Sequence, residues 1–174
     1  MKIKLVILIV AQFLFNTYCL AAEYKLGPGD KISVTVYNES DLSISNVKIP
    51  KDGVISFPLL GEIKVSGNSL SSLKSNITKL LKDGYLKKPQ IVISINEYRP
   101  FFINGQVKQP GGYPYVESLT VRKAIAIAGG LTDRASVAKI GLVPEGKVRS
   151  RTLRNGLDKP VNPGDIITIG ESLF

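Results

Sequence analysis

Two aspartates, each preceded by a Pro-Gly pair, are the residues whose types and spacing come nearest to suggesting chemistry. Asp30 ends a Leu-Gly-Pro-Gly-Asp sequence, and Asp165 ends an Asn-Pro-Gly-Asp sequence. A carboxylate can serve as a general acid or base, but Pro and Gly favour a turn in which Asp bonds its own backbone. Apolar residues alternate directly after each copy, over 31–37 and 166–169. We therefore interpret both copies as structural motifs that start a strand: Gly27, Pro28, Gly29 and Asp30, and Pro163, Gly164 and Asp165.

Two residue counts limit the chemistry further. The chain has no His and a single Cys among its 174 residues. It therefore lacks the commonest general base and the commonest metal ligand, and it can form neither an intrachain disulfide nor a Cys-based zinc site. Ser-His-Asp and Cys-His catalysis are excluded by counting. We expect no catalytic residues, no cofactor and no metal, so the prediction is that the protein is not an enzyme.

The N-terminus carries the pattern of a secretory signal peptide. Two lysines precede an apolar stretch over 5–15, which is too short to span a bilayer, and small residues including Ala21 and Ala22 follow. We expect residues 1–22 to be cleaved and the mature chain to be exported. An uncleaved N-terminal membrane anchor is the alternative.

Two structural units must position these motifs, and the first covers residues 23–98. Strands are predicted over 31–37 and 90–95, with a hairpin formed by 54–57 and 62–65. Ser69 can cap a helix in which five apolar residues share one face: Leu70, Leu73, Ile77, Leu80 and Leu81. This unit is therefore β-rich with one amphipathic helix.

The second unit covers residues 99–174 and predicts strands around a single helix. The strands are expected over 101–103, 113–116, 139–143, 148–153 and 166–169, and the helix over 121–128 behind a cap at Ser118 or Thr120. Gly105 ends a strand, Gly111 and Gly112 allow a tight reversal, and Gly129 and Gly130 stop the helix. Strands with one interposed helix favour a β-grasp-like module. The expected fold class is α+β throughout.

The sequence resembles the Wza-type polysaccharide biosynthesis and export family. The first unit is similar to the family's export domain and the second to its soluble-ligand-binding β-grasp repeat. The matching stretches follow the family's order: 24–30, 53–61, 65–67, 103–107, 110–113 (which begins with Pro110), 119–121 and 128–131. Each motif is short, but their ordered combination covers nearly all of the mature chain.

The resemblance implies a periplasmic component of an exopolysaccharide or capsule export machine. Subunits would form a closed homo-oligomeric ring that guides polymer toward the outer membrane, and they would act with an inner-membrane chain-length regulator. The longest family members carry a C-terminal membrane helix that this sequence lacks, so it resembles a short form. We therefore expect it to need a separate outer-membrane barrel or a longer export protein, and to be associated with the outer membrane.

Four cations near the predicted β-grasp turns and helix are candidate contacts for an acidic polymer: Lys108, Arg122, Lys123 and Arg134. The net charge is +9, with 44% hydrophobic and 21% charged residues. A basic surface suits nucleic acid, anionic lipid or an acidic polymer, and export argues against nucleic acid. The four cations can equally form a solvated face. Two other functions stay open, namely a monomeric glycan-binding or sensing module and a carboxylate-dependent lyase or glycosidase.

Overall fold

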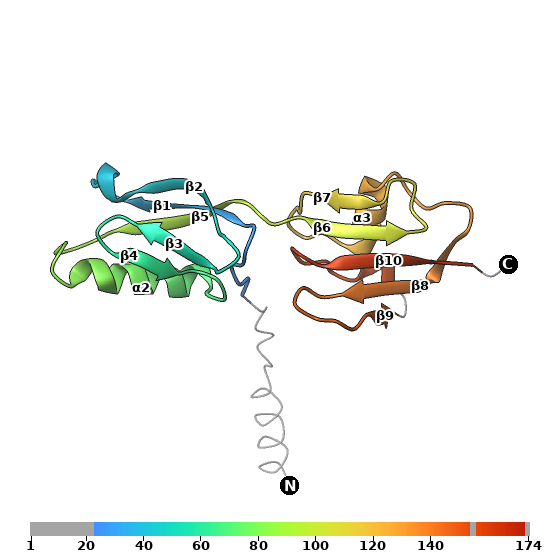
Figure 1. Cartoon of the computed structure of the whole chain (residues 1–174). Helices are drawn as coiled ribbons and strands as arrows, with labels where there is room; N and C mark the ends of the chain where they lie inside the picture. The colour runs from blue at the N-terminus through green and yellow to red at the C-terminus, as the bar shows by residue number, and fades with distance from the viewer. Residues whose placement is uncertain (1–22, 154–155, 173–174) are drawn as a thin grey trace, which may run out of the picture.

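The computed structural model describes residues 23–153 and 156–172, and the predicted signal peptide lies outside these ranges. The elements fall into two groups joined by residues 98–100 (Figure 1). Each group has a hydrophobic core of its own, one built from residues between Leu26 and Ile91 and the other from residues between Phe101 and Ile169. The fold class is α+β, as predicted.

The first group contains a three-stranded antiparallel sheet in the order β2-β1-β5. Its strands are β1 (Lys31–Val36), β2 (Ile44–Lys48) and β5 (Ile91–Glu97), and a short 3-10 helix, η1 (Ser40–Leu42), joins the first two. The predicted alternation in β1 is confirmed, because Ile32, Val34 and Val36 are all buried. The strand β2 was not predicted from the sequence.

A hairpin and a helix complete the first core. The hairpin is β3 (Val54–Phe57) with β4 (Gly61–Lys64), and α2 spans Leu70–Lys82. The Ser69 side chain accepts a hydrogen bond from the Ser72 N–H, which is the predicted cap. Leu73, Ile77 and Leu81 are buried in the core, whereas Leu80 is 37% exposed, so its assignment to the core face was wrong.

The second group forms a five-stranded sheet in the order β7-β6-β10-β8-β9, with α3 packed on one side (Figure 1). The strands are β6 (Phe101–Gly105), β7 (Gly111–Tyr113), β8 (Ala135–Val143), β9 (Arg151–Leu153) and β10 (Ile166–Glu171). The helix α3 covers Val121–Ile127, with Thr120 as its cap, and a 3-10 helix, η2 (Gly156–Asp158), follows β9. The first and last strands of this group, β6 and β10, pair in parallel at the centre. That arrangement is a β-grasp.

Gly111 and Gly112 do not form the tight reversal that was predicted for them. Gly111 and Gly112 belong to β7, paired with Ile103 and Phe102, and residues 106–110 make the reversal. Neither glycine has a positive φ. A Cβ on Gly112 would come within 2.9 Å of the Phe102 ring, whereas at Gly111 the nearest atom is 4.0 Å away. Packing across the sheet, rather than the turn, therefore restricts Gly112.

Candidate functional site at the junction of the two units

The two Pro-Gly-Asp motifs form the same turn. The backbone N–H of Asp30 donates to the Gly27 carbonyl at 3.2 Å, and that of Asp165 donates to the Asn162 carbonyl at 3.1 Å. In return Oδ2 of each aspartate accepts a hydrogen bond at 2.9 Å, from the Gly27 N–H in one turn and from the Asn162 N–H in the other. Both side chains are buried, and each residue directly precedes a strand, β1 or β10.

The second carboxylate oxygen of each aspartate reaches a more distant part of the chain. Oδ1 of Asp30 accepts from the backbone N–H of Arg99 at 2.8 Å, and Oδ1 of Asp165 accepts from the backbone N–H of Glu145 at 3.2 Å. Each motif therefore anchors one further residue through its backbone. The two anchored residues carry opposite charges.

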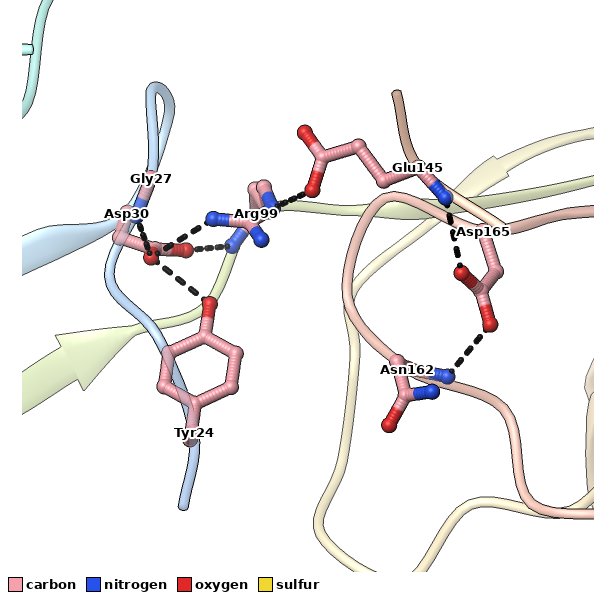
Figure 2. A network of polar contacts seen from close by, with 7 residues as sticks. All are labelled: Tyr24, Gly27, Asp30, Arg99, Glu145, Asn162 and Asp165. Carbon is pink, nitrogen blue, oxygen red and sulfur yellow. Dashed lines mark hydrogen bonds and ion pairs between the residues drawn. The ribbon is translucent and has the colours of Figure 1, made fainter. Parts of the chain in front are cut away.

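The side chain of Arg99 contacts both Asp30 and the other anchored residue, Glu145 (Figure 2). Its Nη1 lies 3.0 Å from Oδ2 of Asp30, and its Nε lies 2.5 Å from Oε2 of Glu145. The Asp30 side chain is fully buried and that of Arg99 is 13% exposed. Because Asp30 belongs to the first unit and Glu145 to the second, the guanidinium forms an ion pair with each unit. We call Asp30, Arg99, Glu145 and Asp165 the junction.

Two glycines are needed where the junction comes closest to the backbone. A Cβ on Gly27 would lie 2.1 Å from Nη1 of Arg99, which is much closer than two non-bonded atoms can approach, so the guanidinium would have to move. A Cβ on Gly164 would lie 2.5 Å from Cδ of Glu145, and the φ of Gly164 is +87°, which favours glycine. These two glycines therefore leave space for the two side chains that form an ion pair with each other.

A row of tyrosines lies beside the junction. The rings of Tyr24 and Tyr98 meet edge to face at 5.1 Å, and those of Tyr98 and Tyr115 do so at 5.2 Å. The Tyr24 hydroxyl donates to Asp30 at 2.7 Å, and the Tyr98 hydroxyl donates to Glu117 at 3.0 Å. The Tyr24 ring also lies 5.6 Å from the Arg99 guanidinium carbon, within the range of a cation–π contact. The row therefore links Tyr24 of the first unit to Tyr115 of the second.

Burial raises the pKa of two carboxyl groups of the junction and of two tyrosines beside it. It raises the pKa of Asp165 despite the two backbone N–H groups that favour its charged form. It also raises the pKa of Glu145, and the Arg99 guanidinium only partly offsets this effect. Burial raises the pKa of Tyr24, assisted by its hydrogen bond to Asp30. Burial and the bond to Glu117 raise the pKa of Tyr98 to about 12.

The four predicted polymer-contacting cations are all exposed, but they do not gather into one site. Arg122 makes a two-pronged ion pair with Asp158, at 3.0 Å and 3.3 Å. Nζ of Lys123 donates to the Ser118 carbonyl at 2.9 Å, and Arg134 forms an ion pair with Glu171. Among the described residues, Lys108 is the one member whose side chain has neither an ion-pair partner nor a hydrogen bond like that of Lys123. Three of the four therefore already have intramolecular partners.

The other predicted motif residues lie at ends and turns of the second unit. Gly105 ends β6 with a φ of +83°, and Gly129 and Gly130 follow α3 with φ values of +79° and +92°. Pro110 lies directly before β7.

Among residues 23–153 and 156–172, no three His, Cys, Asp or Glu side chains are close enough to hold a metal ion. No helix within the same ranges has the length and apolar character to cross a membrane.

Comparison with known families identifies both units. Residues 20–96 match the family described as polysaccharide biosynthesis/export protein, and residues 100–152 match the SLBB domain. An export domain followed by an SLBB domain defines a class of polysaccharide export proteins. The chain belongs to the Wza-type polysaccharide biosynthesis/export family, as the sequence motifs predicted.

Several curated proteins are similar to this chain. The exopolysaccharide production protein ExoF of Rhizobium meliloti (strain 1021) is 30% identical over 122 residues, which cover 64% of this chain and 29% of that protein. The EPS I polysaccharide export outer membrane protein EpsA of Ralstonia nicotianae is 24% identical, over 86% of this chain and 46% of its own. The polysialic acid transport protein KpsD of Escherichia coli is 29% identical, over 74% and 23%. The chain spans less than half the length of each of these relatives.

Two of the four junction residues were predicted from the sequence and two were not. Asp30 and Asp165 were identified and assigned to turns, but Arg99, Glu145 and the adjacent Tyr24 had no predicted contact. Arg99 followed by Pro100 marked only the start of the second unit. A single cation between two units is a weak signal, and no local pattern around Glu145 points toward Arg99.

Proposed function

We propose that this protein is a periplasmic component of a bacterial exopolysaccharide or capsule export machine, and that its subunits form a ring that guides polymer toward the outer membrane. In this proposal residues 1–22 are a cleaved signal, residues 23–98 are the export domain, and residues 99–174 are the ligand-binding β-grasp domain. The observation that carries the proposal is the ordered pair of family matches, joined through Arg99.

The junction supports the ring part of the proposal. A head-to-tail ring closes only when every subunit repeats the same rotation, so the two domains of each subunit must hold a constant angle. Arg99 is bonded to both domains, and the tyrosine row lies along the same boundary. These contacts favour a constant angle over a free hinge.

The proposed role is export rather than catalysis. The relatives are named for the production, export or transport of polysaccharide. At the junction, Asp30 and Asp165 use their carboxylate oxygens in hydrogen bonds that hold the turns. We propose two protein partners, an inner-membrane chain-length regulator and a separate outer-membrane export protein, with the polysaccharide as cargo and no nucleic acid.

Deletion of the gene in its native host tests the proposal. Secreted polysaccharide should fall to background while lipid-linked precursor is still made, and the wild-type gene supplied in trans should restore secretion. N-terminal sequencing of periplasmic protein should find a start near Ala22 or Glu23. Normal secretion by the deletion strain, or a cytoplasmic product that retains Met1, would contradict it.

A monomeric glycan-binding module is the second candidate, and one observation favours it. An open cavity of about 570 Å³ lies between η2 and β8, lined by Val137, Leu153 and Leu157 and by the Arg122–Asp158 ion pair. Its size falls within the range of small-molecule sites. Sedimentation of the mature protein at high concentration separates the candidates, because the ring requires a multiple of the monomer mass.

A further inference from the structure

One helix of the export domain carries a continuous polar stripe with a single sign of charge. Six side chains repeat at helical spacing along α2 and face away from the core: Ser71, Lys74, Ser75, Thr78, Lys79 and Lys82. Figure 1 shows α2 along one side of the first unit. The opposite side of the helix supplies Leu73, Ile77 and Leu81 to the core, so the stripe is the side that a ligand can reach.

The lysines of this stripe differ in their partners from the two candidate arginines of the β-grasp domain, Arg122 and Arg134. No carboxylate in residues 23–153 or 156–172 forms an ion pair with Lys74, Lys79 or Lys82, whereas Arg122 and Arg134 each have one. The helix contains no acidic residue. Two acids lie at its ends: Asp83 follows the last turn, and Glu23 accepts a hydrogen bond from Ser71 at 2.8 Å.

The stripe also has the shape and hydrogen-bonding groups that an acidic sugar requires. Its six residues line a shallow open groove of about 530 Å³. Ammonium groups bind carboxylates, and hydroxyls donate to and accept from the ring hydroxyls of a sugar. The groove is lined by both kinds of group and by no apolar side chain. An anionic membrane would meet the same charges, but the apolar face that inserts a helix into lipid is buried here.

We propose that the exposed face of α2 binds an acidic polysaccharide, one that carries carboxylates along its chain. This inference rests on the proposed export function and names the class of its cargo. It also moves the polymer contact from the β-grasp cations to the export domain. Binding at this face is electrostatic and weak for each sugar, which suits a polymer that must move past the surface.

Helix stability alone does not account for all three lysines. Lys79 and Lys82 lie in the last turn, where the helix dipole favours a cation. Lys74 lies near the middle of α2, where the dipole has little effect. A role in binding covers all three positions.

Binding of the mature chain to polygalacturonate, with neutral dextran as the comparison polymer, tests the inference. We expect binding to polygalacturonate only, and it should weaken as salt screens the charges. The K74Q/K79Q/K82Q variant should lose at least about tenfold in affinity at low salt. K147Q/R149Q/K159Q is the matched control, because it removes the same charge from exposed positions on the β-grasp domain that are not among the candidate polymer contacts. It should bind within about twofold of wild type.

Three results would overturn the inference: equal losses in the two triple variants, equal binding to dextran, or lysine-dependent binding to phosphatidylglycerol vesicles without binding to polygalacturonate. Circular dichroism should show both variants folded. The gene deletion separates this inference from the proposed function. If secretion needs the gene but binding ignores the α2 lysines, only the inference fails. If binding behaves as expected but the deletion strain secretes normally, the export proposal fails.

Discussion

The two Pro-Gly-Asp turns share a backbone design but have different surroundings. Each aspartate accepts one N–H from its own turn and one from a distant residue. Asp30 also accepts from the Tyr24 hydroxyl and the Arg99 guanidinium, whereas Asp165 accepts from the backbone N–H groups of Glu145 and Asn162. The same motif therefore holds a charged contact between domains at one site and a local turn at the other.

This difference separates two roles of a buried carboxylate. Where its partners are N–H groups of the local fold, as at Asp165, burial raises the pKa and the charge costs stability. Where a guanidinium is added, as at Asp30, each charge depends on the other. Removal of one partner then leaves the other buried and unpaired. We therefore expect substitutions at the two motifs to differ in size.

The largest effect should come from D30N. The variant leaves the guanidinium of Arg99 without its buried carboxylate and places an amide where donors converge. We expect the free energy of unfolding to fall by about 3–5 kcal/mol, measured by urea denaturation of the mature chain. D133N is the control, because Asp133 is exposed, and it should change little. Equal stability of the two variants would contradict the role of Asp30.

D165N should have a smaller effect. An amide can accept only one of the two backbone N–H groups that Asp165 satisfies, but it also removes a buried charge. We expect a loss of about 1–3 kcal/mol in the same experiment. A loss as large as that of D30N would show that the guanidinium does not distinguish the two motifs.

The Glu145 carboxyl should have a pH signature of its own. Burial raises its pKa in the folded state, so its contribution to stability is complete below the ordinary glutamate pKa and is lost as the pH rises through the raised value. The stability of wild type relative to E145Q should therefore fall between mildly acidic and neutral pH. We expect a change within about 1 kcal/mol, because the side chain is 41% exposed. A rise with pH would mean that the Arg99 ion pair dominates instead.

Y98F should have the smallest effect. It removes one hydrogen bond, from the Tyr98 hydroxyl to Glu117, and keeps both ring contacts, so we expect a loss of about 0.5 kcal/mol. Y37F is the control, since Tyr37 is 66% exposed. In an ultraviolet titration wild type should show a tyrosine with a pKa of about 12 that Y98F lacks. An unchanged titration curve would contradict the assignment.

Local patterns predicted most of the fold because local interactions determine those elements. The Ser69 cap and the spacing of Leu73, Ile77 and Leu81 predicted α2, and these residues do cap the helix and fill the core. The strand β2 was missed because its period is broken. Asn46 has a φ of +53°, and the register with β1 shifts between Ile32 and Val34, so the apolar residues do not alternate.

The site was less predictable than the fold for a different reason. Asp30 and Asp165 stand in recognisable turns, so their backbone role could be inferred from neighbouring residues. The Arg99–Glu145 ion pair depends on the packing of β6 and β10 beside the loop that follows β8. Nothing in the sequence around either residue encodes that approach. The cations of the β-grasp domain likewise gave no sign that Asp158 and Glu171 neutralise two of them.

The short connection between β5 and β6 has a mechanical consequence. Residues 98–100 join the two domains, and the Pro100 carbonyl accepts from the Gly164 N–H at 3.1 Å, so the connection itself is tied to the second domain. Because the connection is short and bonded to the second domain, it cannot lengthen when a torque acts on the β-grasp domain. The torque must first pull the guanidinium of Arg99 from Asp30 or from Glu145. We therefore expect the two domains to rotate together under a small torque, and to rotate separately only after one of these ion pairs has broken.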